Sequence, residues 1–258
     1  MPLDGTNQTL GIISIMYYDL IYVNGDSFVA GNGLAQGEYT DDNLYTLKEW
    51  KHNYNKVFND STLKKIHSLH LSGYLTNKEK ENAWPSTLEK ITNIKTINEA
   101  YYSQSALTIA IKSIQSLSKI KDKNKKILAL IGTAPFGRLW FPKAGTNTIQ
   151  LSVFGGQPTE LENNIAEYYV NNASLDDLKS QYEISFLGLK KFAEKNNIDL
   201  YFINHYLSEQ NNLVNEYVID TIGKDADHTL SVFTACGHYP KKYHDSLAHR
   251  LKQRFEEI

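Results

Sequence analysis

The chain has 258 residues, of which 41% are hydrophobic and 22% charged, so it can bury a sizeable core and is not disordered as a whole. This length suits one α/β domain or at most two small ones. The formal net charge of -2 creates no global positive field that would gather nucleic acid, and a single cysteine, Cys236, excludes an internal disulfide framework.

Short runs of apolar, β-branched or aromatic residues recur along the chain, and each has the length of a strand buried on both faces of a sheet. In chain order the predicted strands are Leu20–Asn24, Ile94–Asn98, Ile127–Gly132, Ile198–Asn204 and His228–Phe233. Longer segments with apolar residues at helical spacing predict helices over Ser105–Leu117, Leu175–Asn196 and Tyr243–Phe255. Strands that alternate with helices indicate a parallel sheet with right-handed crossovers and helices on both faces.

The stretch from Asp41 to Ala83 is longer than a simple crossover needs, and we expect it to form extra helices that shape one wall of a cleft. No linker, internal repeat or low-complexity tract argues for a second domain. Residues 1–258 are therefore predicted to form a single domain with a helical insertion at about 41–83.

The N-terminal stretch and the lengths of the apolar runs bear on the location of the protein. The stretch Met1 to Gly11 lacks the basic region of a signal peptide, and no apolar run approaches the roughly 20 residues that cross a bilayer. We therefore expect a soluble protein with no signal peptide and no membrane span.

The first predicted strand runs directly into Gly25, Asp26 and Ser27. Gly25 permits a tight turn, and Ser27 would lie just beyond the strand end, where chemistry gathers in parallel sheets. The alternative is that Asp26 and Ser27 only cap a helix. A serine also needs a neighbouring base before it can act as a nucleophile.

A candidate base lies near the other end of the chain, in the segment CGHYPKKYHDSLA. His238 is expected in a turn before the last helix, at the same sheet edge as Ser27. Near neutral pH a histidine can take the serine proton and return it to a leaving group. His244 lies inside the helix, so we interpret it as a packing residue or the source of a supporting hydrogen bond.

A Gly-Asp-Ser serine near the N-terminus and a histidine just before the C-terminal helix resemble the arrangement of the GDSL/SGNH hydrolase superfamily. Ala83–Ile109, Leu128–Arg138 and the terminal GHYPKKYHDSLA are similar to blocks of SGNH-like proteins often encoded by bacteriophages. The chain lacks the Gly-x-Ser-x-Gly motif of α/β-hydrolases. The resemblance implies a flavodoxin-like, three-layer α/β/α fold with a five-stranded parallel sheet.

The resemblance also implies acyl transfer without a cofactor, in which Ser27 attacks an ester carbonyl and His238 is the base. The oxyanion donors of the family correspond to Ser103 and Thr133, where the family has glycine and asparagine. Because losing one oxyanion donor typically costs about 10²–10³ in rate, these substitutions bear directly on turnover.

A second departure concerns the group that orients the histidine. The aspartate that the family has three residues before the histidine is Ala235 here. Asp225 or Asp227 from the preceding loop, or a backbone carbonyl, would have to fix the tautomer of His238 instead.

Further side chains are candidates for binding substrate, among them Asp26 and His244. Arg138 would bind a carboxylate, a phosphate or sugar hydroxyls, or form a structural ion pair. Aromatic residues near strand ends would form a sugar-stacking wall or pack in the core: Tyr101, Tyr102, Phe136, Trp140 and Tyr239. No Cys-x-x-Cys or His-Glu-x-x-His pattern supports zinc, so we expect no metal.

Three functions fit these observations. The first is a serine-dependent esterase or O-acetyl deacetylase that acts on a small ester or an acylated glycan. The second is a catalytically impaired phage structural or glycan-binding protein, and the third is an intracellular lipase or thioesterase-like enzyme. We expect the protein in the cytoplasm or associated with a phage.

Overall fold

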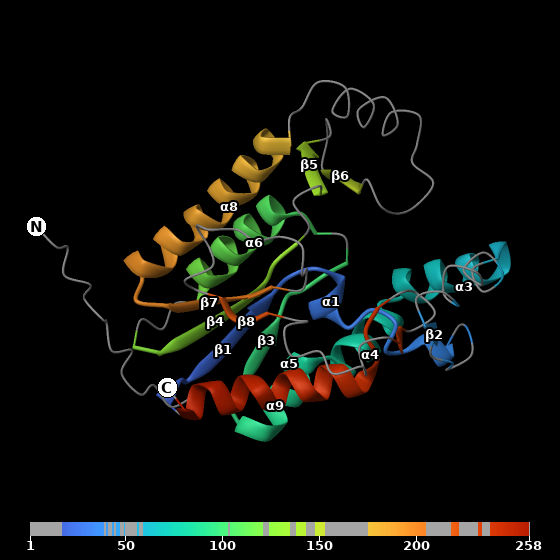
Figure 1. The fold of residues 1–258 in the computed structure, drawn as a ribbon, viewed down its shortest axis with the longest axis horizontal. Coiled ribbons are helices and arrows are strands. Elements are labelled where there is room, and N and C mark those ends of the chain that lie inside the picture. The colour runs from blue at the N-terminus through green and yellow to red at the C-terminus, as the bar shows by residue number, and fades with distance from the viewer. Residues whose placement is uncertain are drawn as a thin grey trace, which may run out of the picture.

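The computed structural model describes residues 17–38, 40, 43, 45–46, 49, 56, 59–102, 104–120, 124–134, 138–142, 148–152, 175–204, 218–221, 232–233 and 238–257. Its centre is a sheet of five strands, each parallel to its neighbours, in the order β3-β1-β4-β7-β8 (Figure 1). This is the 2-1-3-4-5 order of flavodoxin-like folds, and it confirms the predicted fold class. The strands are β1 (Leu20–Asn24), β3 (Thr96–Asn98), β4 (Ile127–Gly132), β7 (Asp199–Asn204) and β8 (Val218–Thr221).

The fifth strand of the sheet differs from the prediction. Of the predicted strand His228–Phe233, the described part is β9 (Val232–Phe233), which pairs antiparallel with β2 (Tyr45–Thr46) in a separate small sheet. The place beside β7 belongs to β8 instead. The prediction was wrong because strand-forming residues show that a segment suits a pleated surface but not which sheet it joins.

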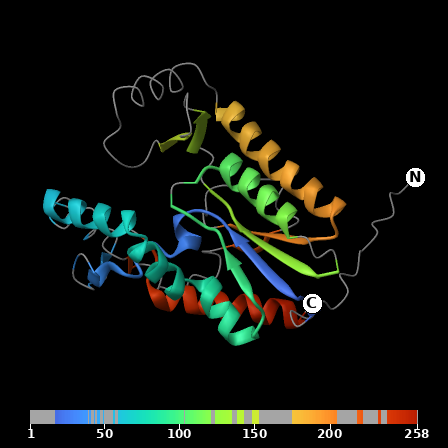
Figure 2. The ribbon, with the colours of Figure 1, turned by 180° about the vertical axis from the view of Figure 1, so that it is seen from behind.

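Helices cover both faces of the sheet, as Figures 1 and 2 show from opposite sides. The helix α6 begins where Ser105 accepts a hydrogen bond from the Thr108 N–H at 3.3 Å, which satisfies one of the free N–H groups of the first turn. One face carries α6 (Ala106–Lys119) and α8 (Leu175–Lys195), and the other carries α5 (Trp84–Thr92) and α9 (Lys241–Glu257).

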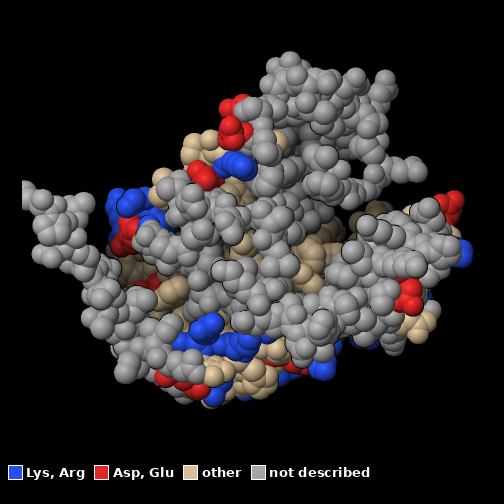
Figure 3. Space-filling model, viewed as in Figure 1, with Lys and Arg blue, Asp and Glu red and all other residues tan. Residues whose placement is uncertain are grey.

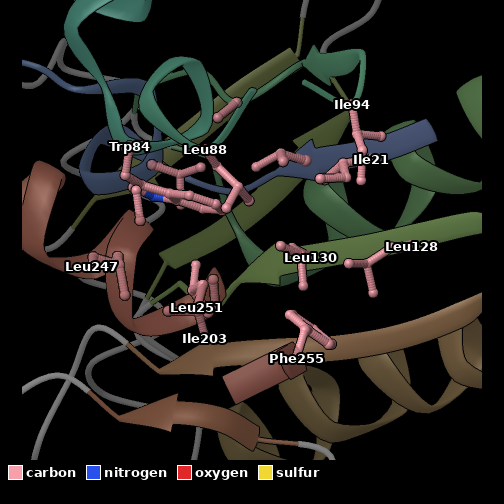
Figure 4. Close-up of a cluster of buried hydrophobic side chains, with 14 of the residues drawn as sticks. Ile21, Trp84, Leu88, Ile94, Leu128, Leu130, Ile203, Leu247, Leu251 and Phe255 are labelled. Atoms are coloured by element: carbon pink, nitrogen blue, oxygen red, sulfur yellow. The ribbon is translucent and has the colours of Figure 1, made fainter. Parts of the chain in front are cut away.

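Alternate residues of the central strands enter two separate cores, because successive side chains of a strand point to opposite faces. Ile21 and Val23 belong to the core that also contains Trp84 and other residues of α5 and α9. Figure 4 shows Ile21 and Trp84 in this core. Leu20 and Tyr22 belong to the core under α6 and α8. Burial on both faces explains why β1 and β4 are apolar along almost their whole length.

The range 41–83, where extra helices were expected, contains α3 (Asp60–Leu71) and α4 (Tyr74–Asn82). Asn59 begins α3 by accepting a hydrogen bond from the Thr62 N–H at 3.0 Å. The helix α4 contacts the short helix α1 (Ser27–Ala30), and both lie beyond the carboxyl end of β1 (Figure 1). The helix α4 therefore reaches the sheet edge where the predicted site lies.

The described surface carries charges of both signs. On the face shown in Figure 3, lysine and arginine side chains lie beside aspartate and glutamate side chains. None of the described helices combines the length and the apolar composition that a membrane span requires. The remaining short elements are η2 (Gln36–Glu38) and an antiparallel hairpin of β5 (Arg138–Pro142) and β6 (Thr148–Ser152).

Candidate active site

A buried asparagine holds the carboxyl end of β1. Asn24 Nδ2 donates to Ser113 Oγ at 3.0 Å and to the Ile109 carbonyl at 3.3 Å, both on α6. Its Oδ1 accepts from the Gly25 N–H at 2.8 Å and from Gln104 Nε2 at 3.1 Å. Because Asn24 is fully buried, these bonds replace water and fix the point where the chain leaves the sheet.

The turn after β1 depends on close packing at Gly25. A Cβ atom at this position would lie 2.4 Å from Val29 Cγ2 and 3.2 Å from Gly132 Cα, so a larger residue does not fit. Asp26 then caps α1, because its side chain accepts a hydrogen bond from the Phe28 N–H at 3.0 Å. Asp26 is fully buried, and this bond gives it the helix-capping role that the sequence left open.

Ser27 is the first residue of α1 and follows β1 directly, at the carboxyl edge of the sheet. Ser27 as a whole residue is only 4% exposed to solvent. The Ser27 carbonyl accepts from the Asn32 N–H at 3.1 Å, which closes the turn behind the helix. Among the described residues, neither the N–H nor the hydroxyl group of Ser27 has a hydrogen-bond partner.

His238 reaches the same neighbourhood from the other end of the chain. Its ring centroid lies 4.8 Å from that of Phe28, the residue next to Ser27, with an angle of 46° between the planes. The Tyr239 ring also packs against Phe28, at 5.1 Å. These ring contacts join the segment before α9 to the helix that begins at Ser27.

The sequence interpretation missed Glu79, a residue of α4 that is only 3% exposed. Its Oε1 accepts a hydrogen bond from the Gly33 N–H at 2.8 Å. Burial raises the pKa of Glu79 to about 7, while the Gly33 N–H and the charge of His238 act in the opposite direction. The surrounding sequence, TNKEKEN, gives no local signal that separates Glu79 from the exposed Glu81.

Two of the predicted aromatic residues form a partly exposed surface at this edge. The rings of Tyr101 and Tyr102 lie 3.9 Å apart with their hydroxyl groups hydrogen-bonded, and His70 of α3 packs against Tyr102 at 4.9 Å. Lys112 Nζ lies 5.7 Å from the centre of the Tyr101 ring. Burial first, and then contact with Tyr101 and the charge of Glu79, raise the pKa of Tyr102.

Tyr239 belongs to a different cluster from Tyr101 and Tyr102. It packs against Tyr243 at 4.2 Å and against the core under α5 and α9, which is the packing role that the sequence left open. Phe136 lies outside the described residues, and the side chain of Trp140 on β5 lies outside them as well.

Thr133, the predicted oxyanion donor after β4, already has partners. Its N–H donates to the Ile203 carbonyl at 3.0 Å, and its hydroxyl lies 3.3 Å from Asn204 Oδ1. Thr133 would have to exchange these partners at the end of β7 before it could bind an oxyanion. Outside the described residues lie the other predicted oxyanion donor and the segment before the histidine: Ser103, Asp225, Asp227, Ala235 and Cys236.

His244 supports the fold from within α9. It is 1% exposed, and its Nδ1 accepts a hydrogen bond from the Trp84 N–H at 3.2 Å, at the first residue of α5. The first N–H groups of a helix have no partner inside the helix, so this bond satisfies one of them. The contact matches the supporting role that its helical position suggested.

Arg138 begins β5 opposite Ser152 of β6, and its side chain lies outside the described part of the chain. Within the described ranges, no three or more histidine, cysteine, aspartate or glutamate side chains come together in a way that could hold a metal ion.

Comparison with known proteins found no matching family model and no matching curated protein. Among solved structures, a protein from Desulfitobacterium hafniense DCB-2 assigned to the G-D-S-L lipolytic family is 11% identical, with a TM-score of 0.46 over 92% of this chain and 99% of that one. A carbohydrate esterase described as having divergent catalytic and non-catalytic binding functions is 15% identical, with a TM-score of 0.49 over 93% of this chain and 68% of that one. A carbohydrate esterase family 2 enzyme with a carbohydrate-binding domain, from Myceliophthora fergusii, is 9% identical, with a TM-score of 0.48 over 92% of this chain and 65% of that one.

Proposed function

We propose that the protein is a serine-dependent ester hydrolase in which Ser27 is the nucleophile and His238 the general base. The observation that carries this proposal is the position of Ser27. It follows the first strand at the carboxyl edge of a parallel sheet, its N–H and hydroxyl have no partner among the described residues, and the His238 ring packs on its neighbour Phe28.

In the proposed reaction, the Ser27 hydroxyl attacks the ester carbonyl while His238 takes the hydroxyl proton. The tetrahedral intermediate then collapses, the carbon–oxygen bond of the alcohol breaks, and His238 returns the proton to the leaving alcohol. Water attacks the resulting acyl-Ser27 ester by the same route, which releases the acid and restores the free serine.

The negative oxygen of the intermediate needs donors that are fixed before the reaction starts. The Ser27 N–H is one candidate, because it has no acceptor among the described residues. Ser103 and Thr133 remain proposals for the other donors. Thr133 can act only after releasing Ile203 and Asn204.

A small ester or an acylated glycan is the proposed substrate. The partly exposed pair Tyr101 and Tyr102 offers ring faces of the kind on which sugars stack, and His70 extends this surface onto α3. The same aromatic surface supports the second candidate, a structural or glycan-binding protein that has this fold but no longer turns over a substrate. The two candidates differ in whether Ser27 reacts.

Hydrolysis of p-nitrophenyl acetate by the full chain tests the proposal. We expect Ser27→Ala and His238→Ala each to lower kcat/KM by at least about 10³-fold, because the two groups act as a unit. Ser246→Ala and His249→Ala are matched controls on exposed positions of α9 and should retain full activity. Equal rates in the wild type and Ser27→Ala would remove the esterase proposal and favour the glycan-binding one.

A further inference from the structure

Glu79 is a buried carboxylate whose hydrogen bonding is incomplete. Its Oε1 accepts the Gly33 N–H at 2.8 Å, whereas its Oε2 has no hydrogen-bond partner among the described residues. No lysine or arginine of the described part forms an ion pair with Glu79. Because an ionised carboxylate is destabilised in a position that is only 3% exposed and holds no ion pair, its position needs an explanation beyond the stability of the fold.

Close backbone packing holds Glu79 beside the turn that follows Ser27. Gly31 has a left-handed backbone with φ of 79°, and a Cβ atom there would lie 2.9 Å from the Glu79 carbonyl and 2.7 Å from Ala83 Cβ. Only a glycine allows this approach. It docks the turn onto α4 and brings the Gly33 N–H to the carboxylate.

His238 and Glu79 both pack at α1 and the turn that follows it: the His238 ring lies 4.8 Å from the Phe28 ring of α1, and Glu79 Oε1 accepts the Gly33 N–H of the turn at 2.8 Å. Two titratable side chains from other elements interact electrostatically with Glu79. The charge of His238, which precedes α9, stabilises the carboxylate and opposes the effect of burial on the pKa of Glu79. Tyr102, which follows β3, is the other, and the charge of Glu79 contributes to raising the pKa of Tyr102. Of these two, only the histidine becomes positively charged near neutral pH.

We propose that Glu79 is the positioning residue of His238: its carboxylate orients the imidazole and stabilises the imidazolium formed when the ring takes the Ser27 proton. This inference rests on the proposed function of Ser27 and His238. It gives the helical insertion the role that the family resemblance assigns to an aspartate at the position of Ala235. The proton stays on His238 until the leaving alcohol takes it, and the form of Glu79 that acts is the ionised one, which predominates above its pKa of about 7.

The first test measures the pH titration of the His238 ring by NMR on the full chain without substrate. The His238→Gln variant identifies the ring signal, because that signal is missing from its spectrum. Glu79→Gln keeps an acceptor for the Gly33 N–H but removes the charge. We expect the midpoint of the His238 titration to fall by roughly one pH unit, because the imidazolium loses its opposite charge. Glu81→Gln, at an exposed position of α4, is the matched control and should leave the midpoint unchanged. An unchanged midpoint in Glu79→Gln overturns the proposal.

The second test is kinetic. With p-nitrophenyl acetate, Glu79→Gln should lower kcat by about 10²-fold with little change in KM, less than the ~10⁴-fold effect of a directly bonded triad carboxylate. The acidic limb of its kcat/KM profile should move to lower pH, following the His238 titration. Glu79→Asp keeps the charge and should recover part of the activity. A lower melting temperature combined with an unchanged pH profile would make Glu79 a structural residue and overturn the proposal.

Two further comparisons separate this inference from its rivals. If Asp225→Asn or Asp227→Asn moves the His238 midpoint and Glu79→Gln does not, the positioning role belongs to that aspartate and not to Glu79. Equal turnover by the wild type and Ser27→Ala overturns the proposed function, whereas the substrate-free titration reports separately on the pair formed by Glu79 and His238.

Discussion

Replacing Asn24 by alanine is expected to destabilise the protein and to loosen the turn that carries Ser27. The Asn24 side chain is fully buried and joins β1 to α6 and to the segment after β3. Alanine removes all of these bonds at once. It also leaves the Gly25 N–H without the acceptor that Oδ1 provides at 2.8 Å.

The size of the effect follows from these contacts. Two bonds are short, to the Gly25 N–H at 2.8 Å and to Ser113 Oγ at 3.0 Å, and the Ile109 contact is longer at 3.3 Å. A net hydrogen bond contributes about 1 kcal/mol, and a buried N–H that loses its partner costs about 1–3 kcal/mol. We therefore expect Asn24→Ala to lower the free energy of unfolding by about 3 kcal/mol.

Urea denaturation of the full chain measures this change, with a constant m-value as the check that the denatured state is unaltered. Ser113→Ala leaves the other hydrogen bonds of Asn24 in place and should cost about 1 kcal/mol. We also expect Asn24→Ala to reduce kcat, because the turn before Ser27 loses its anchor. A free energy of unfolding within about 0.5 kcal/mol of the wild type would refute the network's role.

Three further changes test other parts of the structure. Gly31→Ala places a Cβ atom 2.7 Å from Ala83 Cβ in a left-handed conformation, so urea denaturation should show a loss of about 1–3 kcal/mol; an unchanged midpoint would contradict the close packing. His244→Ala leaves the Trp84 N–H unpaired and opens a cavity, so it should cost about 2–4 kcal/mol with an unchanged KM, and a raised KM would indicate contact with substrate. The pKa of Glu79 is raised from 4.5 to about 7 in the folded state, so the wild type loses stability as the pH rises from 4.5 to about 7. Glu79→Gln has no such group, so its free energy of unfolding relative to that of the wild type should increase over the same pH range, and a constant difference would contradict the raised pKa.

The central part of the fold could be predicted because its signals are local. β1 and β4 are buried on both faces, and a short continuous apolar run is the pattern that such burial imposes. The edge strand β8 gives no comparable signal, since its VIDT sequence is short and mixed. The predicted strand that ends at Phe233 has suitable residues, but pairing is decided by contacts that are distant in the sequence.

Part of the candidate site could likewise be predicted from the sequence, and part of it could not. Ser27 follows a strand that the sequence already predicts, and His238 precedes a helix that the sequence already predicts, so their positions follow from the order of the elements. Glu79 has no such signal, because its burial results from the approach of Gly31 and Gly33 to α4. The role of a charged residue in a polar helix therefore emerges only from tertiary contacts.

The reactivity of Ser27 can be measured without knowledge of the natural substrate. An activated organophosphonate ester is incubated with the full chain; the hydroxyl of an activated serine attacks its phosphorus, displaces the leaving group and becomes phosphonylated, and the modified peptide is located by tandem mass spectrometry. We expect a single adduct on Ser27, lost in Ser27→Ala and much slower to form in His238→Ala. An adduct on another residue, or labelling of Ser27 at the same rate with and without His238, would contradict a nucleophile activated by this histidine.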